Sequence, residues 1–225
     1  MTKTEIFNLY DHLRFLGFSP EFILRGDLVR LISEYWPAFE LSTTANFSDQ
    51  TELKADLHFV KSAEKDAYFL QKYRAILHHP DDPAMEKSQT FSMTNGMQVK
   101  LKEAYNLLQG RVVFKEIAPS KGNKYNAWVQ LNFKEKDAGG DFKLIKYRSH
   151  HGYELANVLN KYPIRELANN DLRDVILQAL KSGDRRHVTF LKPSGKTEKK
   201  IIEANPMLKT INIFPAVTTS QKLAK

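Results

Sequence analysis

The sequence predicts an α+β fold in which a mainly antiparallel sheet carries flanking helices and the chain forms two lobes. At 225 residues the chain is long enough for one large domain or two small ones, each with a hydrophobic core. Apolar residues recur at helical spacing up to Pro37 and alternate after it, which indicates a change from helix to strand. Predicted strands then come in runs followed by helices, without the regular alternation that a parallel sheet requires.

The N-terminal lobe, residues 1–85, is expected to begin with helices. Between residues 5 and 16 the apolar side chains form one stripe of an amphipathic helix. Ser19 followed by Pro20 is a typical helix start, and the helical pattern continues to the next proline. Gly26 could split this second segment into two short helices.

A β-hairpin is expected to complete this lobe. Side chains 53–59 alternate between apolar and polar, as in a half-buried strand. Residues 67–77 are compatible with a helix or a returning strand, and their alternating aromatic side chains favour the strand. Residues 78–87, with two prolines and several acids, indicate a loop, where we place the boundary between the lobes.

The second lobe, residues 86–215, is expected to combine a sheet with helices. Thr94-Asn95-Gly96 separates two short runs, at residues 89–93 and 97–100, and predicts a tight hairpin. Residues 216–225 are small and polar and are expected to form a flexible tail. Apolar spacing and turn residues predict helices at 102–108, 153–161 and 171–181, and strands at 111–117, 125–134, 142–148, 187–192, 198–204 and 208–214.

The bulk composition indicates a soluble, cytoplasmic protein. The chain has no cysteine, so no disulfide, thiol nucleophile or cysteine-bound zinc is expected. Its N-terminus lacks the apolar stretch of a signal peptide. Nowhere do about 18 apolar residues run together, so no membrane segment is expected.

The charges are distributed unequally along the chain. Residues 1–100 contain 11 Lys and Arg against 14 Asp and Glu, whereas residues 101–225 contain 23 against 12. The second part therefore carries a net charge of +11. Such asymmetry is typical of a segment that contacts a polyanion or an acidic partner.

The cations of the second lobe are the candidate nucleic-acid-binding residues. Clustered cations suit phosphate binding, because each neutralised phosphate releases condensed counterions. Lysines on strand edges also discourage edge-to-edge aggregation, and we give the two interpretations equal weight. The candidates crowd around one predicted hairpin and along one further strand: Lys143, Lys146, Arg148, Arg185, Arg186, Lys192, Lys196, Lys199 and Lys200.

Trp128 is the candidate aromatic residue for stacking a base. On strand 125–134, alternate residues from Tyr125 are apolar, whereas Trp128 lies among amides and Lys134 on the other face. Sheets with exposed aromatic residues stack unpaired bases in this way. The alternative, which we favour because large aromatic residues are usually mostly buried, is that a C-terminal helix covers Trp128.

No motif in the sequence predicts catalysis, a metal site or a cofactor. Ser194-Gly195-Lys196-Thr197 is similar to the end of a phosphate-binding loop, but Phe190 stands where that motif needs glycine. His78-His79 and His150-His151 lack a third ligand at a familiar spacing. Asp81-Asp82 are interpreted as solubilising loop residues, because nothing nearby would separate their pKa values. We therefore expect a protein that is not an enzyme.

Several segments resemble a family of functionally uncharacterised bacterial proteins. The resemblance covers roughly residues 50–215 and is carried by LKEAYNLLQGRVVFK at 101–115, KYNAWVQLNFK at 124–134, YPIRELA at 162–168 and IEANPMLKTINIF at 202–214, with shorter matches at 57–62, 66–69, 88–91 and 188–190. The resemblance implies a genomic setting, since such proteins are often encoded on conjugative and other mobile elements, sometimes beside or fused to DNA-processing proteins. It implies no catalytic residues.

The function that these patterns favour is that of a non-enzymatic accessory protein of a mobile genetic element, whose basic lobe contacts nucleic acid. The alternative is a protein-interaction module without nucleic-acid binding, in which the charged lobes dock against each other or against acidic proteins. A third hypothesis, a hydrolase of nucleic acids, would require carboxylates or histidines around a metal ion. The spacing of such residues does not assemble that group.

Overall fold

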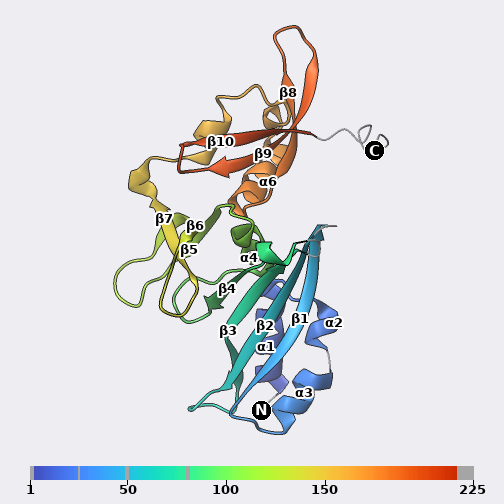
Figure 1. The fold of residues 1–225 in the computed structure, drawn as a ribbon, viewed down its shortest axis with the longest axis vertical. Coiled ribbons are helices and arrows are strands. Elements are labelled where there is room, and N and C mark those ends of the chain that lie inside the picture. Colours follow the sequence, from blue (N-terminus) through green and yellow to red (C-terminus); the bar gives the residue numbers. More distant parts are fainter. Residues whose placement is uncertain (1–2, 25, 49–50, 80–81, 217–225) are drawn as a thin grey trace. The chain divides into compact units, whose positions relative to one another are not determined.

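The structure, a computed structural model, describes residues 3–24, 26–48, 51–79 and 82–216. Its three antiparallel sheets and its helices confirm the predicted α+β class (Figure 1). None of the described helices is long and apolar enough to cross a membrane. The chain divides into two compact units: the N-terminal unit comprises residues 1–109, 116–125 and 132–143, and the C-terminal unit comprises residues 110–115, 126–131 and 144–225.

Three short helices open the N-terminal unit. They are α1 (Lys3–Leu16), α2 (Pro20–Ile23) and α3 (Gly26–Ser33), as the apolar spacing predicts. The hydroxyl of Ser19 accepts a hydrogen bond from the N–H of Phe22 at 3.2 Å, which confirms the predicted helix start.

A four-stranded sheet follows, in the order β1-β2-β3-β4 (Figure 1). Its antiparallel strands are β1 (Ala38–Ser48), β2 (Thr51–Lys61), β3 (Tyr68–His78) and β4 (Lys87–Ser92). The hairpin of β2 and β3 confirms the prediction, whereas β1 was not predicted. Both strands bury alternate side chains, among them Leu57 and Tyr73. The ring of Phe18, just after α1, meets Tyr73 edge to face at 5.7 Å, so the helical segment covers this face.

The expected lobe boundary near residue 85 lies inside the N-terminal unit. The described part of the segment before β4 contains one turn of 3-10 helix, η1 (Pro83–Met85), and β4 then pairs with β3, Leu77 opposite Lys87. The far side of β4 is covered too, because the N–H of Thr90 donates to the Asp141 carboxylate at 2.8 Å. Pairing on both sides therefore ties β4 to this unit, despite the loop-like composition before it.

The predicted hairpin around Thr94-Asn95-Gly96 does not form, because residues 97–100 are not a strand. These residues contact other parts of the unit instead. Met97 and Val99 are buried, and the Tyr73 hydroxyl of β3 donates to the carbonyl of Val99 at 2.9 Å. The carbonyl of Gly96 accepts from the N–H of Ala118 at 2.8 Å. Contacts with residues distant in sequence thus replace the local pairing that the turn residues suggested.

The helix α4 (Leu101–Leu108) and a three-stranded sheet come next. The backbone N–H of Lys100 donates to the Glu103 carboxylate at 2.8 Å and so caps the start of α4. The sheet has the order β5-β6-β7, with β5 (Val113–Ile117), β6 (Tyr125–Lys136) and β7 (Phe142–Arg148). Each of its strands contributes residues to both units.

The C-terminal unit is completed by short helices and a second three-stranded sheet of order β10-β9-β8. Its further elements are η2 (Ser149–His151), α5 (Leu155–Leu159), η3 (Arg165–Ala168), α6 (Asn170–Lys181), β8 (Arg186–Leu191), β9 (Thr197–Asn205) and β10 (Thr210–Pro215). Asn169 caps α6, its side chain accepting from the N–H of Leu172 at 3.0 Å. Apart from its first residue, the expected tail at 216–225 lies outside the described residues.

One hydrophobic core holds the C-terminal unit together. Ile176 and Leu180 of α6 pack with Val188 of β8 and Ile202 of β9, all of them buried. Trp128 of β6 belongs to the same core. The sheet strand that carries Trp128 is therefore covered by the helices that follow it in sequence.

Candidate functional site

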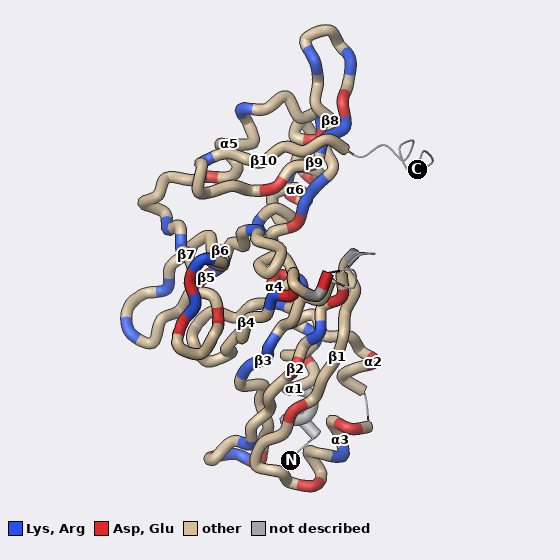
Figure 2. The backbone as a smooth tube through the Cα atoms, in the orientation of Figure 1, with Lys and Arg blue, Asp and Glu red and all other residues tan. Residues whose placement is uncertain are grey.

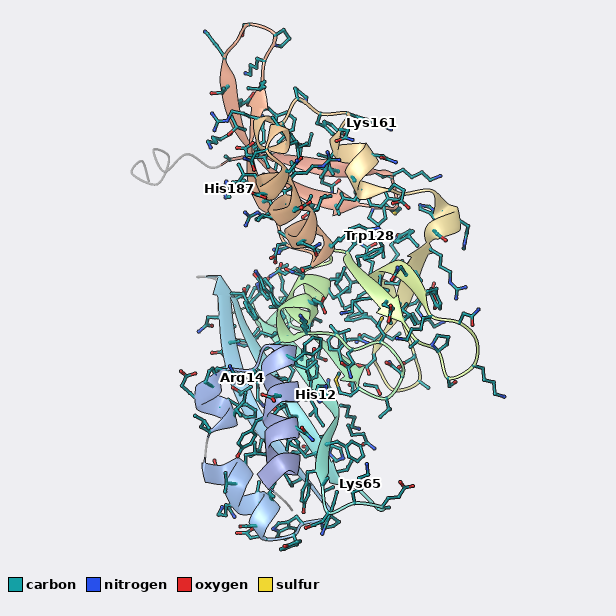
Figure 3. All side chains as sticks on the ribbon, turned by 180° about the vertical axis from the view of Figure 1, so that it is seen from behind. His12, Arg14, Lys65, Trp128, Lys161 and His187 are labelled. Carbon is teal, nitrogen blue, oxygen red and sulfur yellow. The ribbon has the colours of Figure 1, made fainter. Side chains whose placement is uncertain are left out.

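Trp128 is only 3% exposed, so the interpretation of this residue as an open stacking platform is wrong. The alternative that we favoured, a C-terminal helix covering it, is confirmed, because Leu155 of α5 and Ile176 of α6 lie in its core cluster. Ala127 and Val129 on the opposite face are buried as predicted. The strand is thus buried on both faces at this point (Figure 3).

Beside Trp128 lies a cavity of about 310 Å³, which we call the aromatic pocket. Four aromatic side chains line it, from β5, β6, β7 and the segment before α5: Phe114, Trp128, Tyr147 and Tyr153. Its polar and charged lining residues are Asn126, Arg148, Ser149, Glu154 and Lys181. Its volume is at the lower end of the range for ligand sites, and its lining combines aromatic side chains with polar groups, as small-molecule sites generally do.

The rings of the aromatic pocket support one another edge to face. Phe114 and Trp128 have centroids 5.2 Å apart at 60°, and Trp128 and Tyr153 have centroids 5.4 Å apart at 67°. Aromatic pairs prefer such tilted contacts, which bring the positive edge of one ring to the negative face of the next. Trp128 therefore contacts two of the other rings and is buried, while Phe114 and Tyr147 are only partly buried.

Hydrogen bonds fix the two tyrosines of the aromatic pocket. The Tyr153 hydroxyl donates to the carbonyl of Thr210 at 3.0 Å, and the Tyr147 hydroxyl donates to the side-chain oxygen of Gln130 at 3.3 Å. Burial raises the pKa of Tyr153 and, to a smaller extent, that of Tyr147 above the ordinary value. Both phenols therefore remain neutral near pH 7 and present rings and hydroxyls, not charge.

Two cations border the aromatic pocket. The Lys181 ammonium lies 5.4 Å from the ring centroid of Phe114, within the range of a cation–π contact. Arg148, at the end of β7, also lines the pocket and was among the predicted candidates. Lys181 was not predicted, because its sequence pattern shows only the polar end of an amphipathic helix. The structure therefore combines two positive groups with four aromatic rings.

Four of the other candidate cations pair with carboxylates. The nitrogen–oxygen distances are 3.2 Å for Lys143 and Glu135, 2.8 Å for Arg185 and Glu203, 2.9 Å for Lys192 and Glu198, and 2.5 Å for Lys200 and Glu198. Figure 2 shows the same mixture, with acidic positions on either side of the basic ones along β9. Pairing lowers the charge that these residues offer to a phosphate.

The cations of the β8–β9 hairpin also lie on different faces of the sheet. Thr189 pairs with Lys199 and Val188 pairs with Lys200, so these two lysines point to opposite faces. Arg186 lies on the face of Lys200, and Lys196 lies in the turn between the strands. These residues therefore do not form one continuous basic surface on the hairpin. Lys146, on β7, is exposed.

One histidine of each pair is engaged in another contact. The ring of His151 bonds to the carbonyl of Pro206 at 2.8 Å, and His78 lies 3.1 Å from the Glu86 carboxylate. Asp81 lies outside the described residues. Within residues 3–24, 26–48, 51–79 and 82–216, no three His, Asp or Glu side chains are grouped so that they could hold a metal ion.

Comparison of this chain with protein families, with curated proteins and with solved structures finds no match. The interpretation of the aromatic pocket therefore rests on its own geometry and chemistry.

Proposed function

We propose that the protein is a non-enzymatic accessory protein that binds single-stranded nucleic acid, with one unpaired base in the aromatic pocket. The observation that carries this proposal is the meeting of four aromatic rings with Arg148 and Lys181 around one cavity of about 310 Å³. The resemblance to proteins encoded on mobile elements supplies the biological setting of the proposal.

The pocket's walls suit a nucleobase. A base is planar and exposes two π-faces, so it stacks on aromatic side chains whatever its sequence. The partly buried rings of Phe114 and Tyr147 offer such faces, and the buried Trp128 holds Phe114 in place. The side chains of Asn126 and Glu154 supply donor and acceptor groups for the edge of the base.

The two cations suit the phosphates on either side of that base. Arg148 binds a phosphate through a planar fork of donors, and Lys181 binds one as a point charge. In a duplex the base would be stacked inside the helix and out of reach, so we expect single strands to bind more tightly than duplexes. Two phosphate contacts on a single strand would give binding that weakens about sevenfold between 50 and 200 mM salt.

The test uses Trp128 as its own reporter. The chain has two tryptophans, and Trp36 is 52% exposed in the N-terminal unit, so Trp36→Phe leaves Trp128 as the only indole. Titration of this variant with a single-stranded 12-mer at 50 mM salt should quench the Trp128 emission, because a base enters its pocket. Fluorescence anisotropy of the labelled 12-mer gives the affinity, with the matching duplex as comparison.

Two double variants separate the pocket from the hairpin. Arg148→Ala with Lys181→Ala should abolish both quenching and binding, whereas Lys196→Ala with Lys199→Ala, which removes the same charge, should retain them. The opposite pattern would reject the pocket as the site while leaving nucleic-acid binding in place. A flat anisotropy signal at micromolar protein and low salt would reject nucleic-acid binding and favour a protein-interaction module.

A further inference from the structure

The first strand of the four-stranded sheet, β1, is an unusually open sheet edge. It is 11 residues long and stands at one end of the sheet order (Figure 1). β2 is the only described strand that pairs with it. Sheet edges of this length are normally covered by other elements or protected by charges, because their backbone groups recruit further strands.

The backbone pairing shows which groups of β1 point outward. The N–H of Lys61 in β2 donates to the carbonyl of Pro37 at 2.9 Å, so the backbone carbonyl of residue 37 points toward β2. Successive residues of an antiparallel strand alternate in this direction. Odd-numbered residues of β1 therefore bond to β2, and the N–H and C=O groups of Glu40, Thr44 and Asn46 point away from the sheet.

Several of the usual protections of an edge strand are missing from β1. Its sequence, AFELSTTANFS, contains no lysine, arginine or proline, and Glu40 is its one charged residue. Its irregularity, a register shift, lies at the far end between Asn46 and Ser48. Leu41 and Ala45 face the helices but remain half-buried, whereas their β2 partners Leu57 and Leu53 are fully buried. The edge thus leaves apolar surface uncovered.

The sequence of β1 is nearly palindromic about Thr43. Phe39 mirrors Phe47, Glu40 mirrors Asn46, Leu41 mirrors Ala45, and Ser42 mirrors Thr44. If two copies of β1 pair antiparallel about a two-fold axis at Thr43, each residue meets its mirror partner. Phenylalanine then meets phenylalanine on the helix-facing side, and the two Glu40 carboxylates stay apart, each opposite an amide.

We propose that β1 pairs with β1 of a second copy of this chain, joining two four-stranded sheets into one continuous sheet across a two-fold axis at Thr43. In this pairing an even-numbered residue always lies opposite an even-numbered residue of the partner copy, for example Glu40 opposite Asn46. The outward N–H and C=O groups of these residues therefore face each other and form the hydrogen bonds between the two strands. The half-buried apolar side chains of β1 become more buried in this dimer, because Leu41 of each copy packs beside Ala45 of the other. The interaction is independent of the aromatic pocket.

Cysteine cross-linking tests the register directly. The chain contains no cysteine, so a single introduced thiol has no competitor. At the axis, Thr43 faces its own copy in a non-hydrogen-bonded pair with Cα atoms about 4.5 Å apart, within the range of a disulfide. Thr43→Cys should form a reducible covalent dimer under mild oxidation. Ala45→Cys, whose partner is Leu41 and not itself, should remain uncrosslinked.

Sedimentation velocity tests the edge itself. Thr44→Pro removes an outward N–H and no bond to β2, and proline is tolerated at such edge positions. The two-fold axis makes the loss occur twice, so the dimer dissociation constant should rise at least about tenfold. Thr44→Ala keeps the N–H and should retain the dimer. Far-UV circular dichroism checks that both variants keep their strands.

The outcomes are distinct. A wild-type chain that stays monomeric at high micromolar concentration, or a dimer that Thr44→Pro leaves intact while position 43 fails to cross-link, overturns the proposal. Equal cross-linking at positions 43 and 45 overturns the register. Loss of oligonucleotide binding without a change in oligomeric state would concern only the aromatic pocket.

Discussion

The rings of Trp128 and Tyr153 meet edge to face with centroids 5.4 Å apart, although they are 25 positions apart in sequence. Trp128 lies in the first half of β6, and Tyr153 precedes α5. Their contact ties the β5-β6-β7 sheet to the helical part of the C-terminal unit and shapes one wall of the aromatic pocket. The pocket and the core of this unit are therefore formed by the same side chains.

Truncation of Trp128 should destabilise the C-terminal unit. Trp128→Ala removes a 3% exposed indole from a packed cluster, which typically costs about 3–5 kcal/mol. Urea unfolding followed by far-UV circular dichroism measures this loss. Trp36→Ala is the matched control: Trp36 is 52% exposed, and we expect a change of about 0.5 kcal/mol. A Trp128 variant as stable as the control would contradict the buried position.

Removal of one pocket cation should weaken nucleic-acid binding and reduce its salt dependence. Lys181→Ala removes one phosphate contact from the proposed site, so the slope of log affinity against log salt should fall by about 0.7. Anisotropy titrations of a single-stranded oligonucleotide at four salt concentrations give this slope. Lys161→Ala removes an exposed lysine of the same unit that does not line the pocket (Figure 3). Equal effects of the two variants would point to non-specific attraction.

Local patterns in the sequence predicted most elements, and the exceptions have physical causes. β1 was missed because the polar residues 42–44 interrupt the alternation of its apolar residues, Phe39, Leu41, Ala45 and Phe47. The false hairpin at 94–96 had the right turn residues, but burial of Met97 and Val99 elsewhere outweighed them. Sequence patterns report on residues that are neighbours along the chain. The strand β1 and the missing hairpin at 94–96 depend instead on contacts between residues that are distant in sequence.

The candidate site was predicted only in part, for a related reason. Arg148 and Trp128 were singled out because of charge and strand position, and both line the aromatic pocket. Their partners Phe114, Tyr153 and Lys181 come from three other segments, and a single sequence does not show which segments converge. Charge counts likewise do not show that Glu198 forms ion pairs with two of the predicted cations, Lys192 and Lys200.

Gly96 should tolerate no side chain. Its φ is +78°, and an added Cβ would lie 1.7 Å from the carbonyl oxygen of Ala118, which is backbone and does not yield easily. Gly96→Ala should therefore cost well over the roughly 1–2 kcal/mol of a left-handed conformation alone. Gly122→Ala is the control, since Gly122 has φ +101° but nothing within 4 Å of the added Cβ. Thermal unfolding that ranks the two variants equally would contradict the close approach of Gly96 and Ala118.

Two buried tyrosines should make the protein sensitive to alkaline pH. Burial raises the pKa of Tyr73 and of Tyr153 above the ordinary value of 10.0. The unfolded chain ionises its phenols near that ordinary pKa, whereas the folded chain holds these two protonated. Their contribution to stability is therefore complete below about pH 10, and it is lost as the pH rises from there through the raised pKa.

Tyr153→Phe tests this linkage because it removes the titrating group and keeps the ring against Trp128. At pH 8 the variant should be less stable by about 1 kcal/mol, since the hydroxyl's 3.0 Å hydrogen bond to the Thr210 carbonyl is lost. Between pH 8 and pH 11, the free energy of unfolding should fall less for the variant than for the wild type, so the two stability curves converge. Urea unfolding at five pH values measures both curves, and a Tyr153→Phe curve that stays parallel to that of the wild type would show that this phenol is not protected from ionisation in the folded chain.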